Sequence, residues 1–188
     1  LKNLNFNEDE EKILKTFNLI STKPKIFICN LNEKEKLDNN KYINLIRSNL
    51  NDERSIIISI SAEIESQISQ LENEVEKKEF LDSLDWNSSG LDRIIKSSYS
   101  KLNLITYFTA GEKETKAWTI KRNSTAPDAS AIIHTDFKKG FICAETTSYE
   151  DYIKYGGSKG AKENGKIRQE GKEYLIKDGD VIHFLFNV

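Results

Sequence analysis

Two short apolar runs in the first third of the chain have the pattern of buried β-strands. Residues 25–29 read KIFIC and residues 55–60 read SIIISI. β-Branched and aromatic residues favour strands, and apolar side chains at successive positions are typical of a strand covered on both faces, as in a parallel sheet. Residues 41–50, between the two runs, carry apolar residues at helical spacing. This order of strand, helix and strand predicts a right-handed βαβ unit.

Further helices are expected on either side of this unit. Residues 8–20 begin with acidic residues, which favour a helix N-terminus, and residues 62–84 and 90–102 repeat apolar positions with a helical period. Residues 61–85 hold eight acidic residues against two lysines. We therefore expect the outer face of this long helix to be solvated.

From about residue 104 the apolar pattern changes from a helical period to a strand period. The predicted elements are, in order, a hairpin of strands 105–109 and 116–120, a helix 126–137, a strand 141–147, a helix 149–155, a loop 156–172, and strands 174–177 and 181–186 joined by a turn at Asp178-Gly179-Asp180. This order predicts a β-grasp, ubiquitin-like domain. The fold class expected for the chain is therefore α/β followed by α+β.

Composition narrows the class of protein. Charged residues make up 31% of the 188 residues but the net charge is only −2, which argues against a histone-like binder and against a disordered acidic tail. Cys29 and Cys143 lie in separate apolar runs without a C-x-x-C or Cys/His cluster, so we expect neither a disulfide framework nor a zinc site. A reducing, cytoplasmic compartment fits this cysteine usage best. No apolar run approaches the roughly 18 residues of a membrane span, and residues 1–20 do not resemble a signal peptide, so no membrane partner is expected.

Polar residues follow both predicted strands of the βαβ unit directly. Asn30, Leu31 and Glu33 come after the first strand, and Ser61 and Ala62 come after the second. The carboxyl ends of parallel strands are where open α/β sheets bind ligands. An asparagine amide is both donor and acceptor and can read the edge of a purine, and Leu31 can lie against the ring. These five residues therefore predict a nucleotide-base site.

Other candidate motifs are weaker. Residues 160–166 read GAKENGK, which matches the phosphate-loop pattern, but Ile167 follows where a hydroxyl for Mg²⁺ is needed and no buried strand precedes them. We therefore reject this match and expect a solvated loop. Residues 154–172 hold six Lys or Arg against two Glu, so this segment is a candidate for contacts with RNA phosphates as well as a plain surface loop. His134 and His183 lie in different predicted elements, and a structural role is expected for each.

The chain resembles the carboxyl-terminal half of the YchF-type Obg-like ATPases, a branch of the P-loop GTPase superfamily. The resemblance covers essentially the whole chain and is strongest after residue 104. The segments that carry it are KPKIFICNLNE (23–33), ISAEIE (60–65), YFTAGEKETKAWTI (107–120), APDASAIIHTDFKKGF (126–141) and EGKEYLIKDGDVIHFLFNV (170–188).

The resemblance implies three pieces. Residues 1–20 are similar to the end of the family's helical coiled-coil insertion, and residues 21–103 are similar to the carboxyl-terminal part of its nucleotide-binding, Rossmann-like G domain. Residues 104–188 are similar to the TGS domain, a β-grasp module shared with threonyl-tRNA synthetase.

The resemblance also implies a function, which is part of a ribosome-associated, redox- and translation-linked ATPase. In the family the NxxE form of the base loop accompanies a preference for ATP over GTP. Here Asn30, Leu31 and Glu33 stand at that loop, and Ser61 and Ala62 stand at the next one. The implied cofactors are ATP (or GTP) and Mg²⁺ in the full-length protein. The implied partners are the ribosome, through the TGS domain, and the amino-terminal half of the G domain.

The family's phosphate loop, switch regions and Mg²⁺-binding residues lie in its amino-terminal half. We therefore expect this chain to hold no catalytic and no metal-binding residues, to be inactive alone, and to bind a nucleotide poorly. One alternative function is a stand-alone, non-catalytic TGS module that binds RNA or the ribosome. Another is a truncated product without independent activity.

Overall fold

The computed structural model describes residues 4, 6–33, 35, 40–50, 55–111 and 113–187. The chain forms two compact units, which we call unit 1 (Leu1–Ser98) and unit 2 (Tyr99–Val188), and each is described by itself. Within the described ranges, no helix combines the length and the apolar character needed to cross a bilayer.

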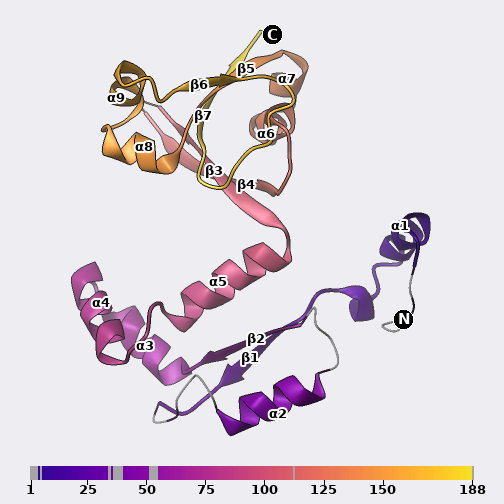
Figure 1. Ribbon diagram of the computed structural model, residues 1–188, viewed down its shortest axis with the longest axis vertical. Coiled ribbons are helices and arrows are strands. Elements are labelled where there is room, and N and C mark those ends of the chain that lie inside the picture. Colours follow the sequence, from indigo (N-terminus) through magenta and orange to yellow (C-terminus); the bar gives the residue numbers. More distant parts are fainter. Residues whose placement is uncertain are drawn as a thin grey trace. The chain divides into compact units, whose positions relative to one another are not determined.

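Unit 1 is built around a two-stranded parallel sheet. Strands β1 (Ile26–Asn30) and β2 (Ile56–Ile60) are joined through helix α2 (Lys41–Asn49), and the register sets Asn30 opposite Ile60. The predicted parallel βαβ unit is therefore confirmed (Figure 1). The other described elements are α1 (Glu8–Thr16), the 3₁₀ helix η1 (Ile20–Thr22), α3 (Ala62–Gln70), α4 (Glu74–Ser83) and α5 (Gly90–Lys101).

The core of unit 1 is small and covers one strand better than the other. Its buried apolar residues are Ile58 of β2, Ile43 of α2, and Ile64 and Ile68 of α3. By contrast, Ile28 in the middle of β1 is 50% exposed. The expectation that β1 is covered on both faces is therefore wrong for the described residues. Side chains of a strand project from the two faces of its sheet, so the described residues leave the face that carries Ile28 partly uncovered.

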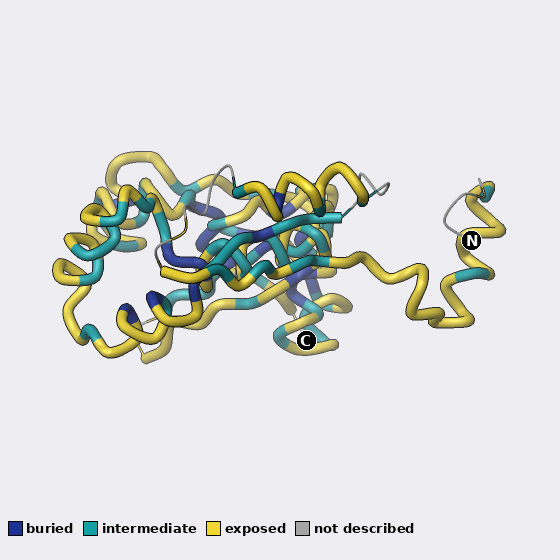
Figure 2. The backbone as a smooth tube through the Cα atoms, turned by 90° about the horizontal axis from the view of Figure 1, so that it is seen from below, coloured by how far each residue is buried: buried dark blue, intermediate teal, exposed yellow. Residues whose placement is uncertain are grey.

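Two helices of unit 1 are shorter than the sequence pattern predicts. The first ends at Thr16, because Asn18 adopts a left-handed backbone (φ 52°) that an α-helix cannot continue. Figure 2 shows that this amino-terminal segment is exposed along nearly its whole length. The long helix expected up to residue 84 is two helices, because the Asn73 side chain accepts the Val75 backbone N–H at 2.8 Å and caps α4.

Unit 2 is built around a five-stranded mixed sheet in the order β4-β3-β7-β5-β6. β3 forms an antiparallel hairpin with β4 and runs parallel to β7, and β5 runs antiparallel to both β6 and β7 (Figure 1). The hairpin, β5, α8 and β7 were all expected from the sequence. The elements are β3 (Leu104–Ala110), β4 (Thr115–Lys121), α6 (Ala126–Ile133), α7 (Thr135–Lys139), β5 (Phe141–Thr147), α8 (Tyr149–Lys154), α9 (Ser158–Glu163), β6 (Arg168–Glu170) and β7 (Val181–Phe186).

The core of unit 2 lies between α6 and one face of this sheet. Tyr107 of β3 is its largest fully buried residue. Its hydroxyl donates to the Ala129 carbonyl of α6 at 2.9 Å, and its ring meets the Phe184 ring of β7 edge to face at 6.0 Å. Burial raises the pKa of Tyr107. This residue therefore ties α6 to the two central strands while its one polar group remains paired.

Two expectations for the middle of unit 2 are wrong. The helix expected over 126–137 is interrupted at His134, whose Nδ1 accepts the Asp136 backbone N–H at 3.3 Å and caps α7. The solvated loop expected over 156–172 contains the helix α9 and the strand β6. Helix geometry at residues 160–163 also supports the rejection of a phosphate loop there.

Residues 174–177, which the structure describes in full, form no strand. Leu175 makes a single bridge with Thr125, and the Ile176 N–H donates to the Ser124 carbonyl at 3.0 Å. The segment therefore bonds to the start of α6 and not to β7. The hairpin expected around Asp178-Gly179-Asp180 is consequently wrong, although the turn itself is present.

Candidate functional site

The carboxyl ends of β1 and β2 meet at one point of unit 1. Asn30 and Ile60 are opposite each other in the register, and the Leu31 N–H donates to the Ile60 carbonyl at 2.8 Å. The Ala62 N–H donates to Asn30 Oδ1 at 3.0 Å. The two segments that the sequence singles out are therefore joined by side-chain and backbone bonds.

Asn30 caps helix α3 from the neighbouring strand. Ser61 is the N-cap residue of α3, but its own side chain makes no capping bond. A helix start needs acceptors for its first N–H groups, and the Asn30 carbonyl oxygen supplies one for Ala62. This bond directs the Asn30 Oδ1 toward the start of α3. It also gives Asn30 a structural role that any ligand-binding role must share.

Ser61 is nearly inaccessible. Its relative exposure is 1%, and among the described residues its Oγ has no hydrogen-bond partner. Buried hydroxyls are usually paired, so an orphan beside a strand end is a feature of functional sites as well as of hydrated ones. The other predicted residues lie close in sequence to this point: Leu31 is half-buried, and Glu33 and Ala62 are exposed. The structure thus brings Asn30, Leu31, Ser61 and Ala62 together at one sheet edge, and Glu33 follows Leu31 by two residues.

Two residues that sequence reasoning missed hold this edge in place. The Glu65 carboxylate of α3 accepts the N–H groups of Gly90 at 2.6 Å and Leu91 at 3.2 Å, at the start of α5. Arg93 of α5 donates through Nη2 to the Ser59 carbonyl of β2 at 2.8 Å. Both contacts join residues 25 or more positions apart, so no local pattern announces them.

The described residues form no group of side chains that could bind a metal ion. No group of three or more His, Cys, Asp and Glu side chains among them is arranged to hold an ion. Of the histidines, His134 caps α7, as a structural residue does. His183 is exposed on β7. The side-chain groups that the site in unit 1 offers are the Asn30 amide, the Ser61 hydroxyl and the Glu33 carboxylate, all of which can form hydrogen bonds.

Comparison with known proteins identifies relatives along the entire chain. Residues 104–187 match the family model YchF-GTPase_C, described as a protein of unknown function (DUF933). The chain is 49% identical over its whole length to the protein named ribosome-binding ATPase YchF of Bacillus subtilis, of which it covers 51%. It is 46% identical to the protein of the same name from Haemophilus influenzae, again over 51% of that relative. The chain thus spans about half the length of the curated relatives it matches.

Solved structures give the same result. The structure of the Schizosaccharomyces pombe YchF GTPase matches 98% of this chain and 49% of that protein, with a TM-score of 0.82 and 33% identity. A GTP-binding protein from Pyrococcus horikoshii matches 88% of the chain with a TM-score of 0.56 and 20% identity, which is evidence of a shared fold alone. The mixed α/β fold is therefore similar to that of a YchF GTPase.

Proposed function

Because this chain belongs to the YchF family and spans its carboxyl-terminal half, we propose that it forms part of a cytoplasmic, ribosome-associated, nucleotide-binding ATPase. The names of the two bacterial relatives support ribosome binding and ATPase activity as the function of the whole protein. The observation that carries our assignment of a site is the bond between Asn30 Oδ1 and the Ala62 N–H. The redox and translation links implied by the family resemblance stay predictions.

In this proposal the edge formed by Asn30, Leu31, Glu33, Ser61 and Ala62 receives the base of ATP. Asn30 presents an amide whose orientation is already set by its bond to Ala62. Leu31 supplies an apolar surface for the ring, and Ser61 contributes a buried hydroxyl without a hydrogen-bond partner among the described residues at the same strand end.

Glu33 supports the preference for ATP over GTP. GTPases that carry an aspartate at the equivalent point of an NKxD loop pair its carboxylate with the two N–H donors of guanine. A glutamate is one methylene longer and does not reach the same place without a shift. A site that cannot pair these donors has no reason to prefer guanine, because selectivity for a hydrogen-bonding group comes from the buried partner that it would leave unpaired.

The phosphate groups and Mg²⁺ are assigned to a part of the protein outside residues 1–188. Among the described residues no group of three or more His, Cys, Asp and Glu side chains is arranged to hold an ion, and we assign no Mg²⁺ ligand to them. Residues 160–166 do not fit a phosphate loop either, because their first four residues lie in α9. We therefore derive no hydrolytic step from this chain.

The proposed domain assignment follows the resemblance. Residues 1–20 belong to a helical insertion, residues 21–103 to the carboxyl-terminal part of a G domain, and residues 104–188 to a TGS domain with a β-grasp fold. The order of strands in unit 2, with β3 parallel to β7 in the middle of a mixed sheet and α6 across one face, supports the last assignment.

A second candidate function is a non-catalytic module that contacts the ribosome through the TGS domain. It is favoured by the excess of basic residues over 154–172. Co-sedimentation of the 188-residue chain with ribosomes over a series of salt concentrations tests it, because phosphate contacts weaken as salt rises. Binding that is independent of salt would argue against this role.

The proposed function is tested on the full-length protein that contains these residues. We expect it to bind ATP about tenfold or more tightly than GTP, and we expect Glu33→Asp to reduce this ratio by improving GTP binding. The exposed Glu63→Asp substitution in α3 is the matched control and should leave the ratio unchanged. A wild-type protein that prefers GTP would overturn the assignment of the base.

A further inference from the structure

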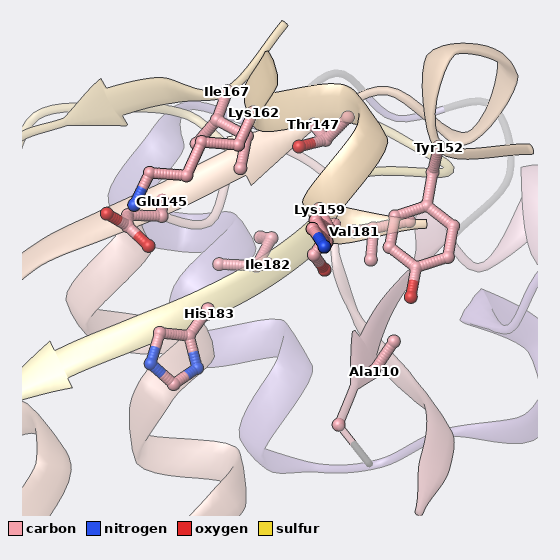
Figure 3. A pocket seen from close by; sticks show the side chains of 12 residues that line it. Ala110, Glu145, Thr147, Tyr152, Lys159, Lys162, Ile167, Val181, Ile182 and His183 are labelled. Carbon is pink, nitrogen blue, oxygen red and sulfur yellow. The ribbon is translucent and has the colours of Figure 1, made fainter. Parts of the chain in front are cut away.

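A pocket of about 460 Å³ lies in unit 2. Its floor is formed by the strands β3, β5 and β7, where Glu145 lies opposite His183 in the register. Its wall is formed by α8 and α9, which contribute Tyr152, Lys159 and Lys162. Figure 3 shows these side chains around the hollow.

The charges around the pocket favour an anion. Lys159 and Lys162 are exposed, and neither has an ion-pair partner within 4 Å in the part of the chain that the structure describes. The neighbouring Lys166, by contrast, lies 4.0 Å from Asp151. Among the described residues that line the pocket, Glu145 is the one carboxylate, and in Figure 3 the Lys162 side chain extends toward it. Two ammonium groups against one carboxylate give the described lining residues a net positive charge.

The size and the other lining groups set limits on the ligand. A volume of about 460 Å³ lies in the range of small-molecule sites, and it is far more than a bare phosphate needs. Thr147, Ser158 and Tyr152 bring hydroxyl groups, while Val181 and Ile167 bring apolar surface. Hydroxyl donors beside lysines suit a phosphate, and the apolar surface suits the flat ring of a molecule that carries one.

We propose that this pocket binds a nucleotide phosphate, with the phosphate group held by Lys159 and Lys162 and the rest of the nucleotide lying over the sheet. Glu145 competes with the phosphate for Lys162 and so weakens the site. The site shares no residue with the base site in unit 1, and it refines the second candidate function, because Lys159 and Lys162 belong to the basic segment 154–172. Its ligand is a free nucleotide or one nucleotide of an unpaired RNA strand, since both present the same chemistry.

The proposal is tested by calorimetric titration of the 188-residue chain with AMP, with inorganic phosphate and with a short single-stranded oligoribonucleotide. We expect AMP to bind more tightly than phosphate. We expect Lys159→Ala and Lys162→Ala each to weaken AMP binding about tenfold, as the loss of a charge-assisted hydrogen bond does. Lys172→Ala is the matched control, because Lys172 is exposed in the same segment but does not line the pocket.

Glu145→Gln should strengthen AMP binding, whereas the lysine substitutions weaken it. It removes the competing negative charge, so AMP should bind about threefold or more tightly. A variant that merely damages the fold cannot produce this gain. AMP binding that Lys159→Ala and Lys162→Ala weaken is assigned to this pocket, because neither lysine belongs to the base site of unit 1.

Titration with the oligoribonucleotide shows whether the bound nucleotide is free or part of an RNA strand. Binding of the oligonucleotide that AMP displaces and that Lys159→Ala weakens supports a nucleotide of an RNA strand. Binding of AMP alone supports a free nucleotide. The proposal is overturned if neither AMP nor the oligoribonucleotide binds at millimolar concentration. It is also overturned if both lysine substitutions leave AMP binding as it is in the wild type.

Discussion

The side-chain oxygen of Asn30 accepts the backbone N–H of Ala62 at 3.0 Å and so connects the ends of two parallel strands. Asn30 therefore has two roles in this account, one structural and one in ligand binding. The acceptor half of the Asn30 amide caps α3, and the donor half is assigned to the nucleotide. The two roles are separable because different substitutions remove different halves.

Asn30→Ala and Asn30→Asp should behave differently in stability. The alanine variant loses the cap of α3 and should lower the free energy of unfolding by about 1 kcal/mol, while exchange of the Ala62 amide proton becomes faster. The aspartate variant keeps an acceptor near a helix N-terminus and should stay close to the wild type. Urea unfolding and amide hydrogen exchange check both results. Equal losses in the two variants would mean that the capping bond contributes nothing.

Glu65 should be as important as Asn30 for the same sheet edge. Its carboxylate accepts two N–H groups at the start of α5, so Glu65→Ala leaves a part-buried donor at Gly90 unpaired. We expect a loss of about 1–3 kcal/mol in the free energy of unfolding. The exposed Glu63 of the same helix is the control, and Glu63→Ala should change this free energy by less than about 0.5 kcal/mol. Chemical denaturation of the two variants measures both changes, and equal losses would contradict the role given to Glu65.

Gly90 lies so close to neighbouring side chains that there is no room for a Cβ atom. A Cβ at this position would lie 2.7 Å from Ile60 Cγ2 and 2.8 Å from Glu65 Oε1. Gly90→Ala should therefore destabilise the protein by about 1–3 kcal/mol, as overpacking does, although alanine is the better helix former. At Gly111 the nearest atom to an added Cβ is 3.8 Å away, and Gly111→Ala should be tolerated. Melting temperatures of the pair provide the comparison, and a Gly90→Ala protein as stable as the wild type would contradict the packing described here.

Tyr174 should make the stability of unit 2 sensitive to alkaline pH. Its hydroxyl donates at 2.8 Å to Asp180, which is 3% exposed. Burial, then this hydrogen bond and the charge of Asp180, raise the pKa of Tyr174 to about 12 from its usual 10.0. A raised pKa means that the stabilisation is complete below pH 10 and is lost as the pH rises toward 12.

Tyr174→Phe checks this pH dependence. At neutral pH the variant should be less stable than the wild type by about 1–3 kcal/mol, because Asp180 loses one donor. The difference should shrink between pH 10 and 12. Tyr149→Phe is the control, since Tyr149 is 51% exposed and its ring contact with Phe108 needs no hydroxyl. A difference that is constant with pH, measured by urea unfolding, would exclude the proposed linkage.

The sequence predicted the sheet edge of unit 1 well, and the reason is physical. Successive apolar residues determine a strand, and parallel strands must end at the same edge, so Asn30 and Ser61 could be placed together without coordinates. The helix breaks at Asn73 and His134 were missed, because the apolar period continues across them while a side-chain cap starts a new helix. The exposure of Ile28 could not be read from the apolar run itself, because it depends on what packs over that face of the sheet. Contacts such as Glu65 with Gly90 span 25 residues and leave no local pattern.

The most direct test of the base site follows the amide resonances of Asn30 and Ala62 in the isotopically labelled full-length protein during titration with ATP and with GTP. We predict that ATP shifts the side-chain amide of Asn30 and the backbone amide of Ala62 at lower concentration than GTP does. If ATP binds tightly while both resonances stay where they are in the free protein, the nucleotide base lies elsewhere and the assignment of this edge is wrong.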